Sequence, residues 1–227
     1  MSAPDGFPLR EPAAPGGEDP GEKETGRVEA FSDGIFAIAM TLLVLDLKVP
    51  RDLAAPDGLL PALSRQWPTF AAYLTSFATI LVMWVNHHRL FSRIRRINGA
   101  FLFLNGLLLL FVTFVPFPTA LVSEYLRRPE ARTAAAIYAG TYVALAIVFN
   151  LLWRYAAGGM RLLDRRTRRA DVEAITRQYA FGPALYFAAF VLAFWSVPAS
   201  LFLCMGLAVF FALTASFGNS GGADSPA

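Results

Sequence analysis

The chain has 227 residues, of which 56% are hydrophobic and only 16% are charged, and its formal net charge is +3. A typical soluble domain carries about 25% charged residues, whereas here the charges are concentrated in short Arg-rich segments between long uncharged runs. Each run approaches the roughly 20 apolar residues that cross a bilayer. Composition therefore predicts an all-α membrane protein and excludes a large soluble domain. Because the basic residues then act as topology signals, we expect no nucleic-acid binding.

The two ends of the chain differ in composition from the rest. Residues 1–25 are rich in Pro, Gly and Glu and lack the apolar core of a signal peptide. We predict that residues 1–25 and 218–227 are disordered tails and that residues 26–217 form one transmembrane domain. The second tail contains a Gly-x-Ser-x-Gly match beginning at Gly218. A hydrolase nucleophile elbow needs a strand before this pattern and a helix after it, so we interpret the match as chance.

Six apolar segments are predicted to cross the membrane, each as one helix. Their approximate ranges are 28–49, 70–88, 98–122, 133–153, 179–196 and 199–217. Pro116 and Pro118 should kink or end the third helix, and Pro198 marks a tight connection between the last two. Lys and Arg are more numerous in the segments that lie inside if the N-terminus is cytoplasmic. The positive-inside rule therefore predicts a multi-pass protein of the cell membrane with both termini cytoplasmic.

Polar residues in the first apolar segment are the first candidates for function, because burying them unpaired in a membrane is costly. The segment begins Arg27-Val28-Glu29-Ala30-Phe31-Ser32-Asp33 and is then apolar for several turns. In the simplest interpretation Ser32 or Asp33 caps the helix. Because Arg27, Glu29 and Asp33 lie within two turns, they also predict an ion-paired network at the inner membrane face.

The second and third segments contain further polar groups. The second ends Trp84-Val85-Asn86-His87-His88-Arg89, and the third has Asn105 in its middle. Adjacent histidines diverge by about 100° on a helix, whereas helical metal pairs are spaced i, i+4. We therefore expect no metal site, and instead interhelical hydrogen bonds from His87, His88 and Asn105. The sequence has no phosphate-binding loop and no Thr-Val-Gly-Tyr-Gly selectivity filter.

These motifs together resemble the transmembrane protein 175 family of potassium channels. The resemblance covers roughly residues 27–217 and is closest to the short prokaryotic members, which have one six-helix repeat per chain. It implies a homotetramer with a central pore lined by the first helix of each subunit, and potassium permeation without a carbonyl-lined filter. The matching residues are Arg27, Phe31, Ser32, Asp33, Trp84, His87, His88, Asn105 and the run Pro116-Phe117-Pro118-Thr119.

The resemblance also implies which side chains narrow the pore. Ile38 would be the leading constriction, followed by Leu42 and Leu45, and Thr41 matches a position linked to ion selectivity. Ala37 stands where some relatives have a hydroxyl residue, which is a departure from the family pattern.

Helix geometry agrees independently with this assignment. The four pore positions have the i, i+3, i+4, i+7 spacing of one helix face, although such a face taken alone more often packs against other helices. At 100° per residue, Ser32 and Asp33 lie about 120–140° away from Ile38. If Ile38 faces a pore, these two residues point back into the subunit, toward the polar groups of the second and third segments.

The sequence therefore predicts a potassium-permeable channel, with K⁺ as the permeant ion, no cofactor and no enzymatic activity. Asp46, near the outer end of the first segment, would concentrate cations. The expected partners are membrane lipid and further copies of the chain. A secondary transporter is a second possibility, but it would need charges or broken helices at mid-membrane, and the segment centres lack Asp, Glu, Lys and Arg. An integral membrane enzyme is a third, with His87 and His88 as its candidate catalytic residues.

Overall fold

The computed structural model describes residues 20–50, 58–160, 162–164 and 167–217, and their regular elements are helices. This confirms the all-α fold. In chain order the elements are α1 (Pro20–Leu42), the 3-10 helix η1 (Leu43–Asp46), α2 (Leu59–Ser64), α3 (Trp67–Phe91), α4 (Gly99–Phe114), α5 (Pro116–Tyr125), α6 (Ala131–Ala157), the 3-10 helix η2 (Gly158–Met160), α7 (Arg169–Leu192) and α8 (Val197–Phe217).

Four helical segments in the described ranges are long and apolar enough to cross a membrane. They are Glu24–Asp46, Trp67–Phe91, Gly99–Tyr125 and Ala131–Met160. The apolar stretch Val197–Leu213 of α8 is shorter, and the first turns of α7 carry several charged residues. The chain is thus a membrane-type helical protein, while the count of six spans stays a prediction.

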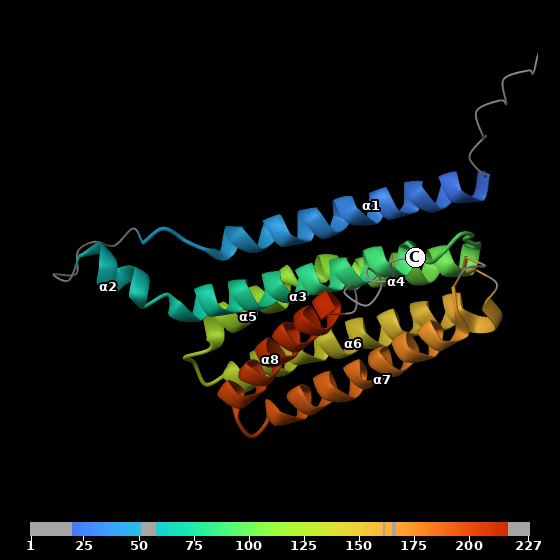
Figure 1. Ribbon diagram of the computed structural model, residues 1–227. Helices are drawn as coiled ribbons and strands as arrows, with labels where there is room; N and C mark the ends of the chain where they lie inside the picture. Colours follow the sequence, from blue (N-terminus) through green and yellow to red (C-terminus); the bar gives the residue numbers. More distant parts are fainter. Residues whose placement is uncertain (1–19, 51–57, 161, 165–166, 218–227) are drawn as a thin grey trace, which may run out of the picture.

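The helices form an elongated bundle in which α1 lies along one edge and α7 along the opposite edge (Figure 1). α1 packs on α3 and α4, α6 packs on α4, α5 and α7, and α8 packs on α3, α6 and α7. Large, fully buried side chains fill the space between them, including Trp153, Tyr138, Tyr142, Phe36, Phe91 and Phe101. Because α1 is covered on one side only, its other side is free in the isolated subunit.

Two helices, α1 and α7, begin earlier in the chain than the spans predicted for them. α1 begins at Pro20, inside the predicted tail, because a proline at the first helical position lacks only an N–H that the helix does not need. Residues 1–19 and 218–227 of the predicted tails lie outside the described residues. α7 begins at Arg169, well before the predicted residue 179. Hydropathy marks where a chain leaves the membrane, and a helix can continue beyond that point.

The prolines of the third predicted span interrupt its helix as expected. α4 ends at Phe114 and α5 begins at Pro116, because proline cannot donate the next helical hydrogen bond. The Val115 N–H bonds to the Val112 carbonyl at 3.2 Å, which tightens the last turn of α4. The third span is therefore two short helices that meet at Val115, whose backbone stays in the α-helical region.

Basic connections gather at one end of the bundle. Ile94 and Leu163 form an antiparallel bridge between the α3–α4 and α6–α7 connections, and Asp164 N donates to Arg93 O at 2.9 Å. The start of α1 lies at the same end, where the Thr25 hydroxyl donates to Arg95 O at 3.4 Å (Figure 1). This arrangement brings together the segments that the sequence places on one side of the membrane.

Candidate functional site

The first helix presents one face to the subunit core and one face outward. Ser32, Phe36, Ala39 and Leu43 are each 0% exposed, and their spacing of four, three and four residues makes them one helical stripe. The predicted constriction residues are on the opposite side, with Ile38 56%, Leu42 41% and Leu45 70% exposed. The structure thus separates these residues from the buried Leu43.

The outward face combines small and apolar residues. Phe31 is exposed on it, and an added Cβ at Gly34 would meet no atom within 4 Å. Ala30, Ala37 and Thr41 are also exposed. Small residues at such a surface let neighbouring helices approach closely. The Thr41 hydroxyl donates to Ile38 O at 2.9 Å, within its own helix.

The outer end of this face departs from α-helical geometry. The chain tightens into the 3-10 helix η1 after Leu42, so Val44, which the α-helical period did not place on this face, is also exposed. Asp46 is half-buried and its Oδ2 accepts no hydrogen bond in the described structure. It borders a cleft of about 460 Å³ that also includes Lys48 and Glu124. Asp46 therefore lies beside charges of both signs.

A buried hydrogen-bond chain fixes the inward face of α1 against α3 and α4. Asn105 Nδ2 donates to Ser32 Oγ at 3.0 Å, and His87 Nε2 donates to Asn105 Oδ1 at 2.9 Å. Ser32 Oγ in turn donates to Val28 O at 2.8 Å. Asn105 is 3% exposed, and Ser32 and His87 are 0% exposed. The interhelical contacts expected of Asn105 and His87 are thereby confirmed, and they join three helices at one level.

Asp33 and Glu29 of α1 find their partners on α3. Trp84 Nε1 donates to Asp33 Oδ1 at 2.9 Å, and His88 Nδ1 lies 2.8 Å from Glu29 Oε1. Arg27 is exposed and, among the described residues, pairs with neither carboxylate. The predicted ion-paired network is therefore replaced by links between helices. Residues two apart do not face each other on a helix, which explains why Arg27 does not reach Glu29.

The adjacent histidines do not act together. His87 is held between Asn105 and the rings of Phe36 and Phe91, whose centroids lie 5.2 and 4.4 Å from its own. His88 instead stacks on Trp84 with centroids 6.3 Å apart. In the described part of the chain, no three His, Cys, Asp or Glu side chains gather where they could hold a metal ion.

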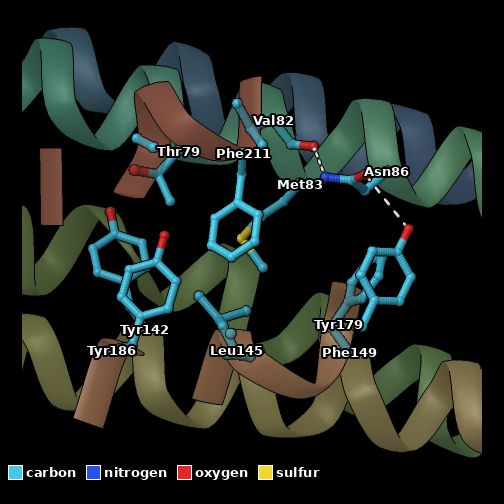
Figure 2. Close-up of a pocket in the computed structure, with 13 residues that line it drawn as sticks. Thr79, Val82, Met83, Asn86, Tyr142, Leu145, Phe149, Tyr179, Tyr186 and Phe211 are labelled. Atoms are coloured by element: carbon cyan, nitrogen blue, oxygen red, sulfur yellow. Dashed lines mark hydrogen bonds between the residues drawn. The ribbon is translucent and has the colours of Figure 1, made fainter. Parts of the chain in front are cut away.

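A cleft that sequence reasoning missed lies between α3, α6, α7 and α8. Figure 2 shows tyrosines at its two ends, with Tyr142 and Tyr186 near Thr79 at one and Tyr179 near Asn86 at the other. Its volume is about 70 Å³, and no charged side chain lines it. The Tyr179 hydroxyl donates to Asn86 Oδ1 at 3.4 Å. This cleft is too small and too apolar to serve as an ion path itself.

Comparison with known proteins shows that the chain is similar to a family of ion channels. Residues 27–116 match the family described as "Endosomal/lysosomal potassium channel TMEM175". The chain is 58% identical to a potassium channel of Chamaesiphon minutus, over 86% of this chain and 97% of that protein. It is 48% identical to a potassium channel of Streptomyces collinus, over 78% of this chain and 86% of that protein.

The fold also matches a solved structure. The crystal structure of a lysosomal potassium-selective channel TMEM175 homolog from Chamaesiphon minutus superposes with a TM-score of 0.78 at 56% identity. The match covers 85% of this chain and 98% of that chain. The similarity therefore extends well beyond the residues that the family description matches.

Proposed function

This chain belongs to the TMEM175 family of potassium channels, and from that membership we propose that it forms a potassium-permeable channel in the cell membrane. The observation that carries the proposal is the outward face of α1, where Ile38, Leu42 and Leu45 are exposed although the helix is apolar. A face that no other described helix of the subunit covers is available to line a pore between subunits.

The pore is assembled from several copies of the chain. One α1 cannot enclose a channel, and symmetric rings are the usual way to bring equivalent faces around an axis. We propose four copies, the number that the family resemblance implies. Small residues at Ala30, Gly34 and Ala37 on the outward face suit close approach of helices at that axis.

Ile38, Leu42 and Leu45 then form rings of branched apolar side chains along the axis. Apolar rings restrict ions by excluding water, because nothing replaces the hydration shell. Potassium crosses passively and partly dehydrated, and Thr41 supplies a hydroxyl beside the ring of Ile38. Asp46 lies at the outer mouth and contributes to the local potential there.

The two helices that fall outside the four candidate spans also cross the membrane in this proposal. α7 has 24 residues and α8 has 21, so at 1.5 Å per residue they are about 36 and 31 Å long, enough for a hydrocarbon core of about 30 Å. Six crossings place both termini on one side. The basic connections make that side the cytoplasm.

The transporter and enzyme alternatives are less well supported by the same geometry. Asp33 and Glu29 of α1 are bonded to α3, and the cleft between α3, α6, α7 and α8 has no charged lining residue that could move with a substrate. His87 donates from Nε2 to Asn105, and because the residue is 0% exposed its other ring nitrogen, Nδ1, is closed to a substrate. It is therefore not arranged as a catalytic base.

The decisive experiment is recording from the purified protein in planar bilayers, with potassium on one side and sodium on the other. A channel gives a current with no coupling ion present, and its reversal potential lies toward the potassium equilibrium value. A flux that requires a second ion would contradict the proposal and favour a transporter. Bilayers that received protein-free detergent are the control.

A further inference from the structure

A groove opens between α3, α5 and α8 at the end of the bundle opposite the basic connections. Its volume is about 280 Å³. On α3 it extends from Trp67 to Thr75, which is about 12 Å along the helix at 1.5 Å per residue. Tyr138 of α6 lines its deep end. The remaining lining includes Ala71, Val122, Arg127, Leu201, Phe202 and Met205.

The interior of the groove presents almost only apolar surface. Thr75 Oγ1 donates to Ala71 O at 2.8 Å, and the Tyr138 hydroxyl is bonded to Ser76 Oγ at 3.0 Å. Both hydroxyls are thus bonded within the protein, and the Thr75 proton is not available to a ligand. A polar solute would gain nothing inside, whereas a hydrocarbon chain would be removed from water or fill otherwise empty space.

The mouth of the groove carries a cation that no carboxylate of the described residues neutralises. The Arg127 guanidinium lies over the Trp67 ring, 5.8 Å from its centroid. The adjacent Arg128 is paired with Glu124 instead. Tryptophan is enriched at the depth of lipid headgroups, and Arg binds phosphate through charge-assisted hydrogen bonds.

These features select one kind of occupant. A helix from a second copy of the chain would bury Arg127 against apolar surface without a counter-charge, which is costly. A phospholipid matches both the charged mouth and the apolar interior of the groove. Its phosphate binds the guanidinium, and its acyl chain lies along the apolar walls. We propose that the groove binds one acyl chain of an anionic phospholipid, with the headgroup phosphate on Arg127.

The headgroup contact is tested by native mass spectrometry of the purified oligomer, incubated with phosphatidylglycerol or with phosphatidylcholine of the same chains. Wild-type protein should retain phosphatidylglycerol more strongly. Arg127→Gln should weaken that retention about fivefold, the effect expected of one basic residue at an anionic surface. Arg128→Gln removes the same charge from the neighbouring position, and should change retention less than about twofold because Arg128 already has a partner.

The acyl-chain contact is tested by filling the groove from two sides. Ala71→Trp on α3 and Met205→Trp on α8 should each reduce phosphatidylglycerol retention while Arg127 is intact. If one variant fails to assemble, the other decides the question. Equal retention by the two arginine variants, equal retention of the two lipids, or full retention in an assembled tryptophan variant would overturn the proposal. The measurement needs no conductance, so it stands apart from the channel proposal.

Discussion

Asp33 shows that the role of a polar residue depends on its hydrogen-bond partner as well as on its type. The sequence shows an acid near an arginine, and predicts an ion pair, but the acid accepts a hydrogen bond from Trp84 of the neighbouring helix. Residue types identified which side chains form the network around Ser32, His87 and Asn105. Their pairing could not be read from the sequence, because it depends on the rotation and depth of α3 and α4 relative to α1.

The Asp33–Trp84 hydrogen bond should stabilise the packing of α1 on α3. Asp33→Ala removes the acceptor and Trp84→Phe removes the donor while keeping a ring. A double-mutant cycle on these two changes should give a coupling of about 0.5–2 kcal/mol, the range found for hydrogen bonds between membrane helices. The free energy of unfolding in detergent micelles is the measurement. Asp33→Asn keeps an acceptor oxygen and should lose less stability; a coupling near zero would make Asp33 an ordinary helix-end residue.

Ile38 is expected to set the narrowest part of the pore. Ile38→Ala widens and wets the apolar ring, so single-channel conductance should rise at least about twofold and discrimination between potassium and sodium should weaken. Thr41→Ala removes a hydroxyl and little bulk, and should change selectivity more than conductance. Bi-ionic single-channel recording measures both quantities.

Leu43 supplies the matched control for Ile38, because it is 0% exposed while Ile38 is 56% exposed on the same helix. Leu43→Ala leaves a cavity in the core and should cost about 2–5 kcal/mol of stability, with selectivity unchanged. Equal effects of the two substitutions on permeation would show that α1 does not line the pore.

At the scale of elements, long apolar runs located every long helix, and the prolines located the break between α4 and α5. The apolar pattern did not reveal α2, which is six residues long, or the switch to 3-10 geometry at Leu43. Both depend on how the chain leaves the bundle. The start of α7 was predicted too late because its first turns carry charged residues, which do not belong to an apolar run. One of them, Asp171, pairs with Arg168 at 3.1 Å.

The outward face of α1 should be wet, whereas other exposed faces should touch lipid. The chain has one cysteine, Cys204, which is buried, so Cys204→Ala gives a clean background. In it, Leu45→Cys should react with a charged, water-soluble thiol reagent and the reaction should block current. Phe103→Cys is the control, since Phe103 of α4 is 74% exposed in the isolated subunit and lipid should cover it. Block through Phe103 but not Leu45 would assign the pore to α4.

For the whole molecule, composition alone predicted a membrane protein and not a soluble one. The family resemblance predicted that this protein is a channel. The subunit structure supports the proposal that several copies assemble around the pore. Its core is filled by large side chains such as Trp153 and Tyr142, and the cleft beside Tyr142 has a volume of only about 70 Å³. In the channel proposed above, the path for ions runs along the outer surface of the subunit, between neighbouring copies.

Assembly through α1 can be tested with two glycines that lie in equally open surroundings. An added Cβ meets nothing within 4 Å at Gly34 of α1 or at Gly206 of α8, so the isolated subunit should tolerate Trp at either position. Gly34→Trp should disrupt the tetramer or abolish conduction, because four bulky rings would meet at the axis. Gly206→Trp should leave both intact, since α8 packs on α3, α6 and α7, away from the proposed axis. Light scattering in mild detergent gives the oligomeric mass. A wild-type monomer that still conducts, or a Gly34→Trp tetramer with normal current, would place the pore elsewhere.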